Sequence, residues 1–304
     1  MEREGKSPLA KMVGIIPLDG YGNDEQFPYA PWLKPIVKDL TLVENAVMQC
    51  AFFGCKQIFI VCEERSAKML KRHVGEWVED PSHYWRHHLR PTEYRVQIPI
   101  YYVRMTEKDK RQRGSYTWAI LQGAEIANRT ARHVSRWTMP EKFFVTFPWA
   151  AFDFWEIKKF RPAFVAVSEF YFSHNGKTAW DGEFLPFTFT QSSWREMRKN
   201  FFKENTLVWR SISDFKRGEK WLERLPLEEQ HSGRTFPLDK LLLPIDNSTY
   251  KEAELEQYYN AYTWDGYRDA VSKLKYQRPK TPILKTANQT RELERLGEYY
   301  DEQR

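Results

Sequence analysis

The feature that most constrains this chain is an alternation of short apolar runs with amphipathic segments over its first 170 residues. Four apolar runs have the length and composition of buried strands: 13–18, 57–62, 96–104 and 143–147. Between them, three segments carry apolar residues at helical spacing: 41–53, 66–74 and 116–127. Strands and helices that alternate in this way form parallel βαβ units. We therefore predict an α/β protein with a mixed, mainly parallel sheet flanked by helices.

The helix predicted over 41–53 carries signals at both of its ends. Thr41 and Glu44 have the spacing of a capping box, in which each side chain accepts a hydrogen bond from the other residue's backbone. Gly54 follows the last apolar position, where glycine commonly ends a helix. These signals fix the predicted helix more firmly than its apolar spacing alone.

The character of the sequence changes near residue 170. One more strand is predicted over 163–168, and aromatic strands and turns follow it. Helices are then predicted to begin near Ser193 and Thr249. We divide the chain into 1–170 and 171–304, as two parts of the same globular unit, the second with a C-terminal helical extension.

Composition excludes several classes of protein. Hydrophobic residues make up 41% of the chain and aromatic residues 16%, which argues against disorder. No apolar run approaches the roughly 20 residues that span a bilayer, and the charged start lacks the apolar stretch of a signal peptide. We therefore expect a cytoplasmic protein without a membrane partner. Cys50, Cys55 and Cys62 lack a paired CxxC spacing, and we expect them to be reduced packing residues.

The net charge of +6 favours a polyanionic partner, because the basic residues are clustered. One cluster lies within 104–113. A second lies among aromatic residues and comprises Arg195, Arg198, Lys199 and Lys203. Basic residues interleaved with aromatic ones suit phosphate contacts and base stacking. The alternative is a pair of solvated faces whose aromatic residues turn into the core.

Three motifs occur in an order that resembles the opening of the sugar-nucleotide pyrophosphorylases: Ile16-Pro-Leu-Asp-Gly-Tyr-Gly, Pro31-Trp-Leu-Lys-Pro-Ile and Gln57-Ile-Phe-Ile-Val. In that family a glycine-rich loop after the first strand wraps the nucleotide, and a lysine in a Pro-Lys-Pro-like motif follows. Gly114-Ser-Tyr-Thr also looks like the family's Gly-Thr-Ala helix start, where backbone amides meet the nucleotide at the positive end of a helix.

The resemblance implies a GT-A-like, Rossmann-like domain over 1–170 that binds a nucleotide sugar. Glycines in such a loop let backbone amides approach the base and phosphates without a Cβ in the way. Asp19 would contact the ribose or base, although a residue before glycine in a turn can equally be structural. The implied nucleotide-sugar-binding residues are Leu18, Asp19, Gly20, Gly22, Lys34, Gly114, Ser115 and Thr117.

Two departures from the family's pattern bear on the reaction. Asn23 and Asp24 stand where the family has a Thr-Arg pair whose arginine handles the departing pyrophosphate. Pro148 and Trp149 stand where it has a Gly-Asp metal motif, which leaves Asp153 as the nearest aspartate and the candidate ligand of a divalent cation, Mn or Mg. A domain that keeps the nucleotide cradle without this apparatus is better suited to transferring the sugar than to making the activated sugar.

With its basic and aromatic second part, the chain is similar in overall character to the phage TET-associated glycosyltransferases, which put sugars on hydroxymethylcytosine in DNA. This resemblance implies transfer from a UDP-sugar to 5-hydroxymethylcytosine in double-stranded DNA, with the cluster Arg195, Arg198, Lys199 and Lys203 on the DNA. Two alternatives stay open. One is a sugar-phosphate nucleotidyltransferase with a rearranged metal site, and the other is a non-catalytic module that binds a nucleotide sugar or nucleic acid.

Glycosyl transfer requires neutralisation of the leaving diphosphate, for which Lys34 and the cluster within 104–113 are the candidates. An inverting enzyme also requires a carboxylate as general base for the acceptor hydroxyl. Asp181 and Asp153 are the candidate catalytic residues, and Glu183 is a third possibility. The alternative for each is a solvated or turn-capping acid.

Overall fold

The computed structural model describes twelve stretches of the chain: 11–18, 30–37, 40–81, 97–107, 109, 114–134, 139–167, 169–205, 209–213, 220–224, 236–245 and 250–274. Their central feature is an eight-stranded sheet with the order β13-β9-β10-β7-β1-β4-β6-β5. In chain order its strands are β1 (Met12–Pro17), β4 (Gln57–Glu63), β5 (Trp77–Glu79), β6 (Gln97–Met105), β7 (Lys142–Val145), β9 (Phe170–Ser173), β10 (Phe187–Thr190) and β13 (Lys251–Glu254).

The middle of this sheet is parallel. β1 pairs in parallel with β4 on one side and with β7 on the other, and β6 continues the parallel set beyond β4. β10 lies antiparallel to both β7 and β9, whereas β13 is parallel to β9. β5 closes the other edge antiparallel to β6. β1 and β7 are buried along their whole length, as expected for parallel strands covered on both faces.

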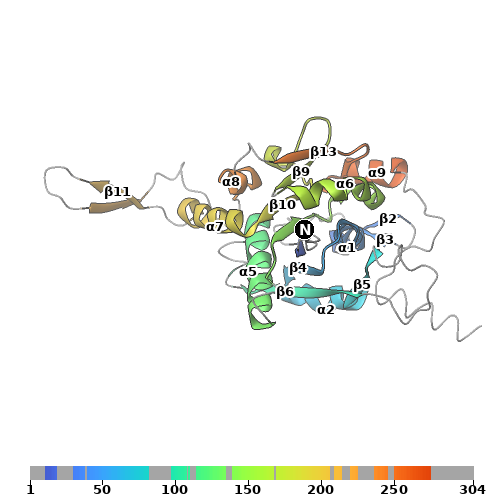
Figure 1. Ribbon diagram of the computed structural model, residues 1–304, viewed down its shortest axis with the longest axis horizontal. Helices are drawn as coiled ribbons and strands as arrows, with labels where there is room; N and C mark the ends of the chain where they lie inside the picture. The colour runs from blue at the N-terminus through green and yellow to red at the C-terminus, as the bar shows by residue number, and fades with distance from the viewer. Residues whose placement is uncertain are drawn as a thin grey trace, which may run out of the picture.

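Helices cover both faces of the sheet (Figure 1). α5 packs on β1 and β4 and contacts α7 and α8, while α1 and α6 pack against each other on the opposite face. In Figure 1 the sheet runs from β6 near the bottom to β13 at the top, with α5 on the left and α1 and α6 on the right. The helices are α1 (Leu42–Phe53), α2 (Glu64–His73), α5 (Tyr116–Val134), α6 (Phe154–Ala166), α7 (Gln191–Asn205), α8 (Leu238–Leu242) and α9 (Trp264–Lys273).

Short elements complete the described structure. They are η1 (Pro31–Leu33), β2 (Pro35–Val37), β3 (Leu40–Thr41), β8 (Ala150–Ala151), η4 (Ala179–Asp181), β11 (Trp209–Ser213), β12 (Lys220–Arg224) and β14 (Tyr259–Asn260). β2 pairs with β3, and β11 pairs with β12. β14 pairs with β8, so a C-terminal segment lies against the chain that follows β7.

α1 lies close to the sheet because β1 contributes a glycine at the contact. A Cβ added at Gly14 would lie 2.7 Å from Sγ of Cys50, so any larger residue there would push α1 away. Phe53 at the end of α1 stacks on Phe144 of β7, with ring centroids 3.9 Å apart. The predicted capping box at the start of α1 is confirmed, and Gly54 ends the helix with a left-handed φ of 97°.

The structure confirms the predicted fold class and corrects two predicted elements. The strand predicted over 163–168 is wrong, because α6 continues through Ala166. Its apolar run could not be told from a buried helix by periodicity alone. The helix predicted near Thr249 is also wrong: strand β13 occupies 251–254 and pairs with β9 at the sheet edge. The helix predicted near Ser193 is α7, which begins at Gln191.

The three cysteines are free and buried, as predicted. Strands from both sides of residue 170 share the central sheet. The division at residue 170 therefore concerns parts of one sheet, and the separate roles assigned to the two parts stay predictions.

Candidate functional site

The order of the parallel strands reverses at β1. From β1 the chain moves to β4 and β6 on one side, then returns through α5 to β7 on the other side. Ligands of open α/β sheets bind outside the carboxyl ends of the strands at such a switch point. Here that edge is formed by Leu18 after β1 and by Thr146 after β7. Leu18 is buried, and its backbone N–H donates to the Val61 carbonyl at 2.9 Å. Asp19, Gly20 and Gly22, predicted to bind nucleotide, lie outside the described residues.

The amino end of α5 reaches the same edge, because α5 connects the end of β6 to β7. Ser115 caps the helix: its hydroxyl accepts a hydrogen bond from the Trp118 backbone N–H at 3.3 Å. Thr117 is buried, with its hydroxyl 2.8 Å from that of Ser115 and donating to the Phe236 carbonyl at 3.2 Å. The Ser115 hydroxyl therefore caps the first turn of α5, and the Thr117 hydroxyl joins that turn to the chain before α8. The contact of Gly114, Ser115 and Thr117 with a nucleotide stays a prediction, and the positive end of the helix is what supports it.

A buried network fixes the turn after β7. The Thr146 backbone N–H donates to the Ile15 carbonyl at 3.1 Å, which extends the pairing of β7 with β1. The Thr146 hydroxyl donates to Oε1 of Gln49, and Nε2 of Gln49 donates to the Ala150 carbonyl at 2.8 Å. All these groups are buried, so each hydrogen bond satisfies a group that water cannot reach.

Trp149 fills the corner after β7, where the sequence resemblance puts the family's metal motif. The indole is fully buried, and its Nε1 donates to the Tyr116 hydroxyl at 3.0 Å. The Trp149 carbonyl accepts from the Ala261 backbone N–H at 2.9 Å. This corner of the sheet is therefore apolar and tied to both α5 and the 258–262 segment.

Five aromatic residues from four separate segments meet over the ends of β1 and β7. Phe184 lies at the centre, with its ring centroid 5.2 Å from Phe147, 5.3 Å from Tyr116 and 5.3 Å from Tyr262. Tyr262 also contacts Trp149 edge-on at 5.8 Å. Tyr262 is 36% exposed, whereas Phe147 and Trp149 are buried. We call these five residues the aromatic cluster. Rings of this kind offer a flat apolar surface with hydroxyl groups at its rim.

Lys34, the predicted phosphate ligand, is fully buried next to α9. Its Nζ lies 5.3 Å from the ring centroid of Tyr267, at a distance typical of a cation–π contact. The Tyr267 hydroxyl donates to the Pro35 carbonyl at 2.7 Å, which holds the ring in place. The structure thus places Lys34 against Tyr267 of α9, and its role toward phosphate stays a prediction.

Asp153, the candidate base and metal ligand, caps α6. Its Oδ1 accepts the Trp155 backbone N–H at 3.0 Å, and the side chain is buried. Glu156 lies nearby, and burial raises the pKa of its carboxyl, although the hydrogen bond that it accepts from the Glu256 backbone N–H opposes part of this rise. Within the described residues, no three His, Cys, Asp or Glu side chains gather in a way that could hold a metal ion. The described surroundings of Asp153 therefore do not fit a metal centre.

The two acids predicted near residue 180 have different environments. Asp181 is exposed, and its Oδ2 accepts the Thr178 backbone N–H at 2.8 Å, so it caps the short helix η4. Glu183 is partly buried and is held by residues outside its own turn. Its Oε2 accepts from Nδ2 of Asn260 at 3.2 Å, and its Oε1 lies 3.4 Å from Nζ of Lys177.

A charged pocket of about 710 Å³ opens at the ends of β4 and β6. Its lining residues are Glu64, Arg65, Lys68, Arg104 and Glu107. Arg104, which belongs to the cluster predicted to neutralise phosphate, is exposed and lies 3.9 Å from Glu64. Since neighbouring strands are about 4.8 Å apart, this pocket lies about 10 Å along the sheet from β1. The candidate site lies at the switch point, where the ends of β1 and β7 meet α5, and the charged pocket lies to one side of it.

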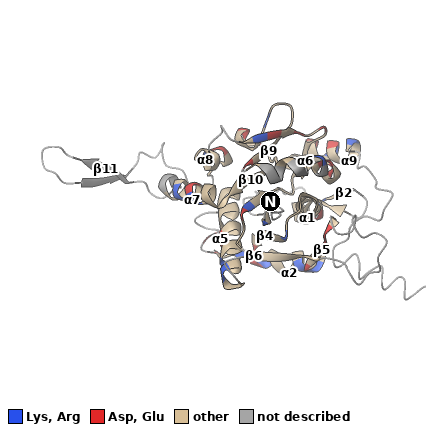
Figure 2. Cartoon of the chain, viewed as in Figure 1, with Lys and Arg blue, Asp and Glu red and all other residues tan. Residues whose placement is uncertain are grey.

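The basic residues predicted to bind DNA lie on α7, and two of the four have acidic partners (Figure 2). Arg198 forms an ion pair with Glu125 of α5, and Lys199 pairs with Glu196 at 2.8 Å. Arg195 is exposed. Trp194 is buried and its Nε1 donates to the Leu121 carbonyl at 3.3 Å, so this aromatic residue turns into the core. Lys203 also lies on α7. The role of these residues toward DNA stays a prediction.

Sequence reasoning did not identify the segment 258–262, which supplies Asn260 and Tyr262 to the site. Its run of aromatic residues, Tyr258-Tyr-Asn-Ala-Tyr, was the available signal. The segment reaches the switch point only because β14 pairs with β8, more than 100 residues earlier in the chain.

In the described part of the chain, no helix is both long and apolar enough to cross a membrane.

Comparison with known proteins supports the fold. No protein-family model and no curated protein sequence matches this chain. A structure of a putative glucose-1-phosphate thymidylyltransferase from Bacillus anthracis, in complex with a sucrose, is similar with a TM-score of 0.51 and 10% identity, covering 88% of this chain and 98% of that one. Rv0371c from Mycobacterium tuberculosis H37Rv aligns over 87% of this chain and all of its own, with a TM-score of 0.47 and 9% identity. The chain therefore has a fold of the nucleotidyltransferase and GT-A kind.

Proposed function

We propose that this chain is a nucleotide-sugar-dependent glycosyltransferase whose reacting centre lies at the carboxyl ends of β1 and β7. The observation that carries the proposal is the corner after β7. There a fully buried Trp149 follows β7, at the position where the sequence resemblance puts the Gly-Asp metal motif of pyrophosphorylases, at a switch point that the amino end of α5 also reaches. An apolar corner suits a sugar ring or an acceptor better than a metal-bound pyrophosphate.

The described residues provide two of the requirements for transfer. The amino end of α5 supplies backbone N–H groups and a positive partial charge for the leaving diphosphate. Lys34, which is buried against Tyr267, and Arg104, which is exposed at the end of β6, are the candidates for the positive charge that the diphosphate requires. A divalent cation, Mn or Mg, would add Lewis-acid stabilisation of the diphosphate. The described residues around Asp153 do not form a metal centre, so we assign Asp153 no part in holding the cation.

As the acceptor we propose 5-hydroxymethylcytosine in duplex DNA. The support is the net charge of +6 together with the basic residues of α7. The ion pairs of Arg198 and Lys199 reduce the charge that α7 offers to phosphate, so a DNA contact there would have to displace Glu125 and Glu196. Binding through phosphate contacts should weaken steeply as salt increases. Fluorescence titration with hydroxymethylated duplex at low and high salt tests this part separately.

A second candidate is a sugar-phosphate nucleotidyltransferase, which the shared fold favours. Product analysis separates the two. Incubation with UDP-glucose and hydroxymethylated duplex should yield modified DNA and UDP if the chain is the proposed glycosyltransferase. Incubation with glucose 1-phosphate and a nucleoside triphosphate should release pyrophosphate if it is the nucleotidyltransferase. Binding of UDP-glucose without turnover in either mixture would indicate a non-catalytic module and would contradict both enzymatic proposals.

A further inference from the structure

Among the described acids near the switch point, only Glu183 combines a held carboxylate with a position beside the aromatic cluster. Asp181 and Asp153 accept backbone N–H groups at the starts of η4 and α6, which accounts for their positions without any substrate. Glu183 caps no helix in the structure. Its side chain instead receives contacts from Lys177 and Asn260, the latter 77 residues away in sequence.

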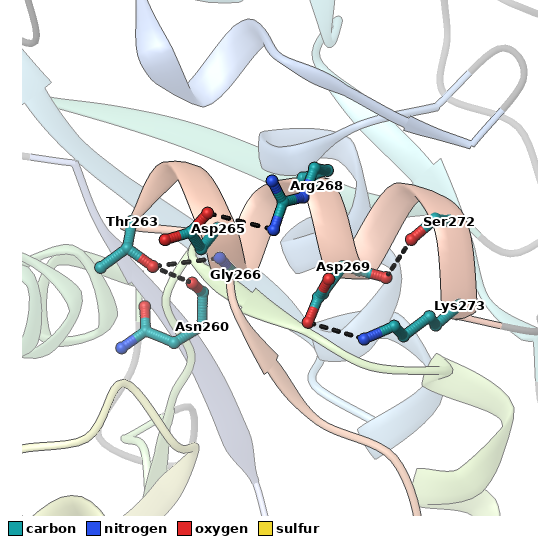
Figure 3. Close-up of polar contacts among 8 residues, drawn as sticks. All are labelled: Asn260, Thr263, Asp265, Gly266, Arg268, Asp269, Ser272 and Lys273. Atoms are coloured by element: carbon teal, nitrogen blue, oxygen red, sulfur yellow. Dashed lines mark hydrogen bonds and ion pairs between the residues drawn. The ribbon is translucent and has the colours of Figure 1, made fainter.

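The contacts of Asn260 link Glu183 to the end of β7. Asn260 pairs with Ala150 across β14 and β8, and the next residue, Ala261, donates its N–H to the Trp149 carbonyl at 2.9 Å. Figure 3 shows the Asn260 carbonyl directed at Thr263 and its side-chain amide directed away from α9. The side-chain amide therefore takes no part in capping α9, and its Nδ2 donates to Oε2 of Glu183.

The neighbours of Glu183 in sequence and space also belong to the site. Phe184, the next residue, is the centre of the aromatic cluster. Burial raises the pKa of the Tyr258 phenol most strongly, and the negative charge of Glu183 raises it further. Tyr258 therefore lies near the Glu183 carboxylate. Lys177, held in a tight turn by its backbone hydrogen bonds with His174, places its Nζ 3.4 Å from Oε1 of Glu183.

We propose that Glu183 is the general base of the transfer reaction, with Asn260 as the residue that positions its carboxylate. This inference rests on the proposed glycosyltransferase function. In the step, the Glu183 carboxylate takes the proton of the acceptor hydroxyl while the acceptor oxygen forms a bond to the anomeric carbon. The bond from that carbon to the diphosphate oxygen breaks, and its electron pair leaves with UDP. A single displacement of this kind inverts the configuration of the sugar.

Hydrolysis of UDP-glucose tests the assignment without knowledge of the natural acceptor, because water can take the acceptor's place. Glu183→Gln should lower the turnover number by roughly 100- to 10,000-fold, the usual range of general-base assistance. Its affinity for UDP, measured by calorimetry, should stay within twofold of the parent. The turnover of the parent should fall as acid protonates the carboxylate, and this acid limb should be missing in the variant. Glu252→Gln, which removes an exposed acid of β13, is the matched control.

Two further measurements separate catalysis from a structural role. Turnover by Glu183→Ala should be partly restored by added formate, which supplies a small carboxylate, whereas a merely destabilised protein gains nothing from it. Asn260→Ala should lower turnover by a smaller factor than Glu183→Gln and keep the acid limb of the pH profile. Glucose released from the α-linked donor should first appear as the β anomer.

The outcomes distinguish failure of this inference from failure of the proposed function. If the parent hydrolyses the donor and Glu183→Gln does so within about twofold of the parent, the assignment of Glu183 is wrong while the enzyme class stands. A large loss in Asp181→Asn but not in Glu183→Gln, or release of the α anomer, would also overturn it. If the parent neither binds UDP nor turns over any nucleotide sugar, the proposed function fails and the assignment of Glu183 fails with it.

Discussion

Gly266→Ala is the substitution for which the structure gives the sharpest expectation. A Cβ added at Gly266 would lie 1.9 Å from the carbonyl oxygen of Asn260 and 3.0 Å from Oγ1 of Thr263. Non-bonded heavy atoms pack at about 3.5–4.0 Å, so α9 and the 260–263 turn would have to separate by more than about 1 Å. The Thr263 hydroxyl, which accepts the Gly266 N–H at 3.2 Å and caps α9, lies in the path of this movement (Figure 3).

The cost follows from these two effects. Overpacking of this kind typically destabilises by about 1–3 kcal/mol, and loss of a threonine cap alone is worth about 0.5–2 kcal/mol. We therefore expect the free energy of unfolding to fall by about 1–3 kcal/mol, seen in urea denaturation as a lower midpoint at an unchanged slope. Because Asn260 positions Glu183 in the proposed site, donor hydrolysis should fall as well.

Gly176→Ala is the matched control. Gly176 has a left-handed φ of 71°, but nothing lies within 4 Å of an added Cβ. Alanine there should cost about 1–2 kcal/mol of backbone strain, with no displacement of Asn260. Stability of Gly266→Ala within about 0.5 kcal/mol of the parent would refute the argument, since a surface change of that size needs no steric conflict.

Three further predictions concern other parts of the chain. Glu156→Gln should stabilise the protein near pH 7, and this gain should disappear toward pH 4. Burial raises the pKa of the Glu156 carboxyl in the folded state. The acid therefore contributes stability only below its unfolded pKa, and this stability is lost as the pH rises through the folded pKa. Denaturation at a series of pH values checks this, and a pH-independent difference would contradict it. Thr41→Ala should cost about 1 kcal/mol by removing the confirmed capping box of α1 with Glu44, and equal urea midpoints for variant and parent would count against it. Gly22→Val should weaken UDP binding in calorimetry without lowering the melting temperature, and unchanged affinity would remove this glycine from the nucleotide site.

The parts of the fold that the sequence predicted correctly are those in which local signals agree. For α1, the apolar spacing, the Thr41–Glu44 capping box and Gly54 all indicate one helix, and the structure contains it. The central strands are continuous apolar runs between helical segments, a pattern typical of parallel strands that are covered on both faces. The error over 163–168 arose where two signals conflicted, since α6 continues through Pro162, a residue that usually interrupts a helix.

The candidate site was harder to predict from the sequence because residues far apart in the chain come together to form it. Asn260 meets Glu183 across 77 residues, and Phe184 meets Tyr116 across 68 (184 − 116). No local pattern marks such a pair. The sequence singled out the acids around residue 181 as candidates. The exposure of Asp181, its role in capping η4 and the contacts of Glu183 distinguish the two acids, and these depend on the folded structure.

Strand β13 protects the sheet against association with other chains. Without Lys251–Glu254, β9 would be an edge strand, and its residues Phe170–Ser173 are all buried and largely aromatic. An uncovered, apolar edge of this kind is a template for pairing between molecules. During synthesis that edge stays open until about 80 more residues have been made (251 − 173 = 78), because β13 lies so far along the chain. The closing strand carries Lys251, Glu252 and Glu254 exposed on its outer side, so the finished sheet ends in charges that discourage aggregation.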